Sequence, residues 1–153
     1  MKTIHLGLTA LLFGLCVSSL QAQSNEVLQK AHLSFLEQKG IDGWIDSDGD
    51  IQFKYHDRTY FIEVDESDTE FFRVVLANIW PIESEIERMQ VLEAVDYANT
   101  EIKVAKAFLV RDNVWVSVEV FVEEPGDYEA FFDRSLSVIE LGVEHFVEKM
   151  REE

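Results

Sequence analysis

The clearest strand pattern in the chain is Val114-Trp115-Val116-Ser117-Val118-Glu119-Val120-Phe121-Val122. Valine returns at every second position, which is the period of a β-strand that buries one face. The residues between the valines would line the opposite face. Residues 104–110 form another β-rich run, and the turn Arg111-Asp112-Asn113 separates it from the valine stretch. We therefore expect two antiparallel strands joined by a short turn.

The segments on both sides of this strand pair have apolar residues at helical spacing. After it, apolar residues recur at steps of three and four, which predicts a final helix capped by Asp127. Its stripe comprises Tyr128, Phe132, Leu136, Ile139, Val143, Phe146 and Met150. Before the pair, Ser84 and Glu87 have the spacing of a capping box, and the pattern predicts a helix over residues 84–100. Its recurring apolar residues are Ile86, Met89, Val95, Ala98 and Ile102.

The first half of the chain is predicted to begin with a helix over residues 24–39, which Ser24 caps and Gly40 ends. Its apolar stripe comprises Val27, Leu28, Ala31, Phe35 and Leu36. Extended runs follow at residues 44–45, 51–55, 59–64 and 71–80, separated by short polar turns, and form three or four antiparallel strands. The order α-β-β-β-α-β-β-α predicts an α+β fold, an antiparallel sheet with helices mainly on one face.

Composition limits the function. The 153 residues include 13 Lys and Arg against 30 Asp and Glu, a formal net charge of -17. Phosphate contacts need clustered basic residues, so a nucleic-acid-binding function is excluded. The single cysteine excludes a disulfide framework and a cysteine-rich zinc site.

The N-terminus has the pattern of a secretory signal peptide over residues 1–22. A short positive start precedes an apolar run from Leu6 to Val17, which is too short to cross a membrane. Two alternatives are a retained N-terminal helix and lipid attachment at Cys16, although Leu15 stands where lipoprotein processing favours a small residue. Cleavage after Ala22 would leave residues 23–153 as one domain with 12 basic and 30 acidic residues and no cysteine. We expect an exported protein, periplasmic or secreted, without a membrane span in the mature chain.

A family resemblance covers residues 25–150. It is carried by residues 49–55, 60–64, 89–99, 103–109 and 116–119 and by the long helix from Asp127. These segments resemble the YbjN family in their order, their spacing and their pattern of apolar residues. The YbjN family shares the type III secretion chaperone-like fold. The resemblance implies a non-enzymatic module that binds protein or peptide segments and is able to dimerise. An export signal would distinguish this chain from relatives that look cytoplasmic.

Candidate sites for metal binding or catalysis are weak. Asp46, Asp48, Asp50 and Asp57 stand at positions 1, 3, 5 and 12 of an EF-hand count, but Ile51 replaces the required glycine. A plain acidic turn is therefore favoured over a calcium site. The mature chain's three histidines, His32, His56 and His145, lack metal-ligand spacing and are expected at the surface. No nucleophile, phosphate-loop or dinucleotide motif is present, so we expect no catalytic residues, no cofactor and no metal.

The face opposite the valines is the candidate binding surface. If the valines pack under the helices, Trp115 and Phe121 point away from them, and Phe61 and Arg73 share their face by the same alternation. These four residues are a hypothetical site for a protein or peptide, basic in charge, or for a second copy of the chain. Two alternatives are that a loop or helix covers this face and that the faces are reversed. Another possible function is an acidic envelope inhibitor, or immunity-type protein, that neutralises a basic partner.

Overall fold

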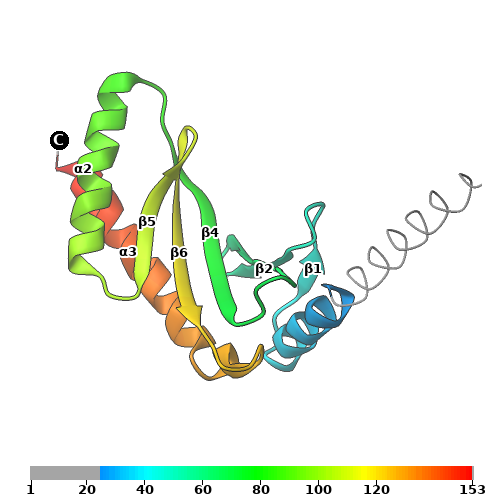
Figure 1. Ribbon diagram of the computed structural model, residues 1–153. Coiled ribbons are helices and arrows are strands. Elements are labelled where there is room, and N and C mark those ends of the chain that lie inside the picture. The colour runs from blue at the N-terminus through cyan, green and yellow to red at the C-terminus, as the bar shows by residue number, and fades with distance from the viewer. Residues whose placement is uncertain (1–24, 153) are drawn as a thin grey trace, which may run out of the picture.

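The computed structural model describes residues 25–152, so the signal peptide predicted over residues 1–22 lies outside the described residues. A first helix covers residues 25–38. The remaining elements are β1 (Gly43–Ile45), β2 (Ile51–Tyr55), β3 (Arg58–Ile62), β4 (Phe71–Pro81), α2 (Glu85–Glu101), β5 (Ala105–Val110), β6 (Asn113–Phe121), a 3-10 turn (Asp127–Ala130) and α3 (Phe132–Arg151). Figure 1 shows their arrangement.

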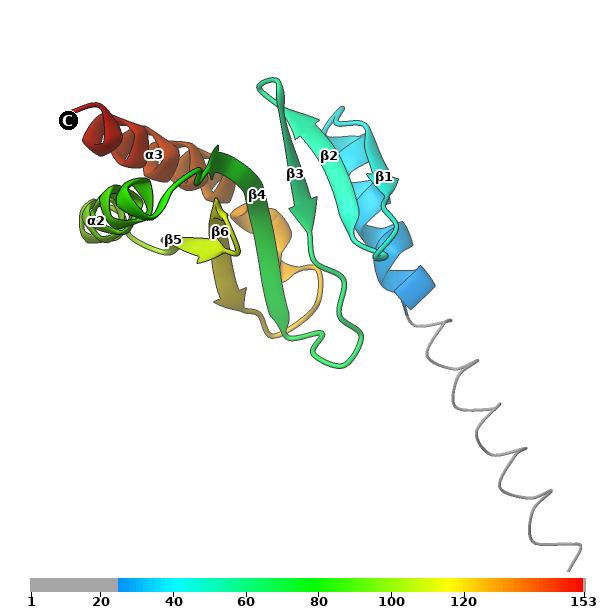
Figure 2. The same cartoon turned by 90° about the horizontal axis from the view of Figure 1, so that it is seen from above.

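All six strands form one antiparallel sheet in the order β1-β2-β3-β4-β6-β5. Figure 2 shows β1, β2 and β3 on one side of β4, with β6 and β5 on the other. The predicted α+β fold class is confirmed. Four strands precede α2 in place of three, because Gly43–Ile45 pairs with β2 as a strand of its own.

Two irregularities shape the sheet. His56 and Asp57 join β2 to β3 with φ values of 46° and 63°, and this pair of left-handed residues gives a tight hairpin turn that follows the strand twist. In β4 the register shifts between Leu76 and Trp80, and Asn78 adopts a φ of 55° at this bulge. The bulge returns Trp80 to the helix-covered face, where its ring meets Phe146 of α3 at 5.8 Å.

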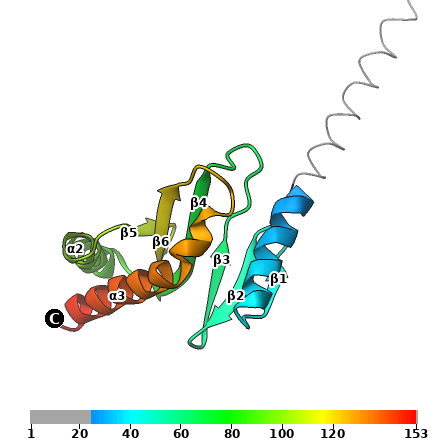
Figure 3. The same cartoon turned by 90° about the horizontal axis from the view of Figure 1, so that it is seen from below.

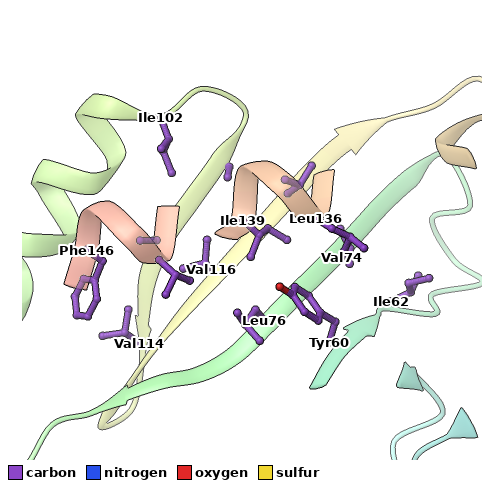
Figure 4. Packing of buried hydrophobic residues seen from close by; sticks show 14 of the residues in the cluster. Tyr60, Ile62, Val74, Leu76, Ile102, Val114, Val116, Leu136, Ile139 and Phe146 are labelled. Atoms are coloured by element: carbon purple, nitrogen blue, oxygen red, sulfur yellow. The ribbon is translucent and has the colours of Figure 1, made fainter. Parts of the chain in front are cut away.

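The hydrophobic core lies between the sheet and the helices. Figure 3 shows α3 and the first helix on the same side of the strands. Val114, Val116 and Val118 are at most 1% exposed on this side, which confirms the predicted valine face. Figure 4 shows Leu136 and Ile139 of α3 directed at the sheet from above.

The first helix is tied to α3 by aromatic side chains. The ring of Phe35 meets those of Phe132 and Tyr128 at 5.1 and 5.3 Å, edge to face. The helix ends as expected at Gly40, whose φ of 72° allows the Ile41 N–H to donate to the Leu36 carbonyl at 2.9 Å. These contacts fix the angle between the first helix and α3.

Helix α2 covers the outer edge of β5. The Asn99 side chain donates to the Ala107 carbonyl at 3.0 Å and accepts from the Ala107 N–H at 2.7 Å. These two bonds satisfy backbone groups that would otherwise be open to pairing with another strand. At the other end of α2, Ser84 Oγ accepts from the Glu87 N–H at 3.2 Å, so the predicted cap is confirmed. The Glu87 carboxylate instead accepts from the Glu83 N–H at 2.6 Å.

Three details of the predicted helices are wrong. Asp127 does not cap α3: its carboxylate accepts from the Glu124 N–H at 3.1 Å, and α3 begins at Phe132 after the separate 3-10 turn. On α2 the buried residues are Val91, Ala94, Val95 and Ala98, whereas Ile86 and Met89 are 76% and 70% exposed. On the first helix Val27 is 62% exposed and Ala31 is also exposed, whereas His32, which was not in the predicted stripe, is buried.

Candidate functional site

One face of the sheet carries no helix, and we call it the open face. The cross-strand pairs Phe61↔Val75, Val75↔Ser117 and Ser117↔Lys106 run across it from β3 to β5. The Trp115 ring lies next to this row and meets the Phe61 ring at 5.8 Å and the Phe108 ring at 6.3 Å, both edge to face. Three aromatic side chains from three strands therefore form one half-buried cluster.

Arg73 lies at the centre of the charged part of the open face. Its Nη1 is 2.7 Å from Glu63 Oε2, and its Nε is 3.0 Å from Glu119 Oε1. The guanidinium carbon also lies over the Phe108 ring, 5.6 Å from its centre. Because the Arg73 side chain is only 22% exposed, these contacts hold it in one orientation beside the aromatic cluster.

Glu119 is held as a carboxylate in this network. Burial alone would raise its pKa, but hydrogen bonds from Lys106 and Ser117 and the charges of Lys106 and Arg73 outweigh burial and lower the pKa. The Lys106 Nζ lies 2.5 Å from Glu119 Oε2 and 5.2 Å from the centre of the Phe108 ring. The open face thus combines aromatic surface with charged groups that already have partners.

The four residues predicted as a site divide into two groups. Phe61, Arg73 and Trp115 lie together, and the Trp115 Nε1–H donates to Asn78 Oδ1 at 3.1 Å. Phe121 stands apart at the end of β6, 82% exposed, with its ring 5.7 Å from that of Phe71. Their role in binding stays a prediction, but the geometry makes the first three a cluster and leaves Phe121 as a separate feature.

Sequence reasoning missed Phe108 and Lys106. Both lie on β5, where residues 105 and 107 are buried and residues 106 and 108 face the other way. The signal was present as the alternation within residues 104–110. It could be used only once the register with β6 was known, because the pairing sets which residue of β5 lies beside Trp115.

The carboxylates of the acidic turn between β1 and β2 accept hydrogen bonds that hold the turn and its neighbours in place. Asp46 accepts from the N–H groups of Asp48 and Asp50 at 2.9 and 3.0 Å and from the Gln52 side chain at 2.9 Å. Asp50 accepts from the Val64 N–H at 2.9 Å. Within residues 25–152, no group of three or more His, Cys, Asp or Glu side chains is placed to hold a metal ion.

The prediction of surface histidines is wrong for His32. This residue is 7% exposed, and its Nδ1 is hydrogen-bonded to the Tyr128 hydroxyl at 2.7 Å. Burial lowers the pKa of His32 from 6.5 to about 4, so the ring is neutral at physiological pH. His56 is exposed at the hairpin turn beside Glu140, and His145 is half-buried next to the Tyr97 ring. His32 is therefore a structural residue of the core.

None of the helices between residues 25 and 152 is both long enough and apolar enough to cross a bilayer. Residues 25–125 match the model of a family described as type III secretion system (YopN, CesT) and YbjN peptide-binding chaperone 1. No curated protein sequence gives a significant match.

Solved structures that share the fold include the following two. YbjN from E. coli superposes with a TM-score of 0.55 over 75% of this chain and 85% of its own, at 14% sequence identity. A chain of the HopA1–SchA chaperone–effector complex superposes with a TM-score of 0.57 over 82% of this chain and 97% of its own, at 9% identity.

Proposed function

Because the chain belongs to the family of YopN-, CesT- and YbjN-like peptide-binding chaperones, we propose that it is an exported, non-enzymatic module that binds protein or peptide segments. The observation that carries the proposal is the aromatic cluster of Phe61, Phe108 and Trp115, left on a helix-free sheet face. A chaperone–effector complex among the structural neighbours supports the same function.

Binding on the open face would combine apolar contact with electrostatic selection. Aromatic rings offer large apolar area at a small cost in side-chain entropy, which suits them to recognition surfaces. The chain's formal net charge of -17 favours the approach of basic segments. We therefore propose that the preferred ligands are extended segments that carry apolar and basic side chains.

The test uses a fluorescent decapeptide of alternating Val and Lys and the variant Trp115→Ser. Fluorescence anisotropy should show binding to the wild-type protein and a loss of about tenfold or more in the variant, since buried aromatic anchors dominate such interfaces. Circular dichroism must show that the variant is folded. If Trp115→Ser binds the peptide as tightly as the wild type, the open face is not the site.

A second variant separates the two groups of predicted residues. Trp115→Ser/Phe121→Ser should lose no more affinity for this peptide than Trp115→Ser alone, because Phe121 does not contact the cluster. Unfolding of the single variant would mean that Trp115 belongs to the core and would reject the site assignment.

Export is a separate part of the proposal and rests on the N-terminal pattern. Expression of the full chain in a bacterium, followed by fractionation and mass spectrometry, should yield a mature N-terminus at Gln23 in the periplasm or the medium. An intact Met1 N-terminus in the cytoplasm would contradict it.

An acidic inhibitor of a basic enzyme is the second candidate, and the charge of the chain is the observation in its favour. Ionic strength distinguishes the two functions. Association of an inhibitor that is steered by charge slows steeply as salt rises, whereas peptide binding on the open face keeps its apolar contacts and should weaken less steeply. Light scattering after size exclusion at low and high salt tests self-association through the same face. A salt-resistant dimer that Trp115→Ser dissociates would support it.

A further inference from the structure

An apolar groove lies beside the end of β6, on the side of the sheet that the helices cover. It has a volume of about 680 Å³ and is bounded by the connection from α2 to β5, by the end of β6 and by the first half of α3. Its apolar lining includes Val104, Val120, Phe121, Phe131, Val138 and Leu141. We call this feature the β6 groove. Val104 and Phe121 both border this groove and are 67% and 82% exposed, so two large apolar side chains at one site are open to solvent.

The backbone of β6 has a free edge at this groove. Pairing between β5 and β6 ends at Ala105↔Val118, whereas β6 continues to Phe121. The Val122 N–H donates to the Glu70 carbonyl at 2.8 Å, on the side of β4. Successive backbone groups of a strand point to opposite edges, so the N–H and carbonyl of Phe121 point away from β4. Among the described residues no strand pairs with them, and an edge of this kind accepts an added strand.

The space beyond β5 is open because the chain turns away at Val104. This residue has a φ of 75°, a left-handed conformation that is unfavourable for a β-branched side chain. In Figure 1 the connection from α2 reaches β5 from the side away from β6. The turn therefore leaves room beside Phe121 for an extended segment in the position that a longer β5 would have taken.

The charges at the groove are the reverse of those of the whole chain. Lys103 and Arg134 line it, with Glu101 as the one carboxylate of the lining. In the part of the chain that the structure describes, neither cation forms an ion pair. Acidic residues outnumber basic ones 30 to 13 in this sequence, so two unpaired cations beside one groove are available to an acidic ligand.

We propose that the β6 groove binds an extended peptide segment with apolar and acidic side chains, which adds as a strand to the free edge at Phe121. The apolar side chains fill the groove against α3, and Lys103 and Arg134 contact the carboxylates. The proposal rests on the proposed function only in that both concern peptide binding. It places the ligand on another surface and gives it the opposite charge preference.

Two decapeptides test it on the 15N-labelled protein by heteronuclear NMR, one of alternating Val and Glu and the other of alternating Val and Lys. The acidic peptide should shift the amide signals of Val104 and Phe121 and leave the Trp115 indole signal in place. The basic peptide should bind this groove at least tenfold more weakly, although the net charge of the protein favours it. Shifts of the Trp115 indole alone would overturn the groove proposal and leave the open-face proposal standing.

Charge reversal provides a variant that does not disturb the core. Lys103→Glu/Arg134→Glu should weaken binding of the acidic peptide about tenfold, since both exposed attractions become repulsions. The matched control is Lys54→Glu/Arg111→Glu, which changes the net charge equally at exposed positions outside the groove and should change the affinity less than twofold. Equal losses in the two variants would mean that only net charge matters and would overturn the proposal.

Strand addition has its own control. The acidic peptide with every valine amide N-methylated cannot pair along one edge and should bind at least tenfold more weakly. Equal affinity of the methylated peptide would overturn strand addition. Saturation of the groove by dodecanoate, with no shift from either peptide, would identify it as a site for fatty acids and would likewise overturn the proposal.

Discussion

Because His32 is buried, we expect the free energy of unfolding of this protein to depend on pH. This dependence should lie at higher pH than the range in which the carboxylates of the protein titrate. The residue is 7% exposed, its ring is hydrogen-bonded to the Tyr128 hydroxyl, and the centres of the two rings lie 5.1 Å apart at a tilt of 52°. Glu63, Asp65 and Asp68 line the small cavity next to it. Burial lowers the pKa of His32 from 6.5 to about 4.

The sign of the effect follows from this direction. Between these two pKa values the unfolded chain binds a proton at residue 32 and the folded chain does not, so stability rises with pH. The contribution of His32 to stability is fully present at pH values above its pKa in the unfolded chain. It is lost as the pH falls toward the pKa of His32 in the folded protein. The shift corresponds to about 3 kcal/mol in all, of which about 2 kcal/mol is lost between about pH 7 and pH 5.

The variant His32→Gln isolates this contribution, because glutamine can still hydrogen-bond to Tyr128 but does not titrate. Urea unfolding of both proteins, followed by circular dichroism in steps from pH 7 to pH 5, gives two stability curves. The wild type should lose about 2 kcal/mol more than the variant over this range. The other titrating groups cancel in the difference.

Two outcomes would refute the reasoning. Parallel curves would mean that His32 titrates with the same pKa in the folded and unfolded chains, so that burial does not control it. A steeper fall in the variant would mean that the neighbouring carboxylates outweigh burial and keep His32 protonated in the folded protein.

Three further predictions concern single residues, and all are measured by urea unfolding. Val104→Asn should stabilise the protein by about 1 kcal/mol, because asparagine tolerates the left-handed backbone that valine disfavours; a loss of stability would show that the Val104 side chain is needed for packing. Ser84→Ala should cost about 1 kcal/mol through loss of the α2 cap, and Ser84→Asp should restore it. Arg73→Met should cost about 1 kcal/mol at neutral pH by leaving Glu119 with one cation, a modest value because both side chains are partly exposed. That last cost should shrink once acid protonates the carboxylates, and a cost that is the same in acid would attribute it to packing.

The strands were predictable because their signal is local. The alternation in residues 114–122 identified the buried face of β6 correctly, and the open face followed from it. The helix on residues 85–101 was predicted over residues 84–100. Val95, Ala98 and Ile102 of its predicted stripe are buried, but the first two residues of the stripe are exposed. Ile86 and Met89 look like core residues by period, yet α2 packs against α3 and β5 through smaller side chains, Ala94 and Ala98 among them.

The candidate site was predictable only in part. Phe61, Arg73 and Trp115 were assigned to one face by alternation, and the pairing of β3, β4 and β6 brings them together. Phe108 was missed because its position beside Trp115 depends on the β5–β6 register. The β6 groove had no sequence signal, because it arises where β5 ends three residues short of β6.

Four features could be read from the amino-acid sequence: the sequence of helical and extended regions, the α+β class, the buried side of β6 and the acidic net charge. These depend on composition and on the periods of two and 3.6 residues, which each segment carries without reference to the others. Three other features became visible only once the elements were packed together. Ile86 and Met89 of α2 are exposed, His32 meets a tyrosine 96 positions away, and Phe121 borders a groove with two unpaired cations. Such features depend on which surfaces meet when the elements pack. The hydrophobic periodicity of one segment holds no information about the element that packs against it.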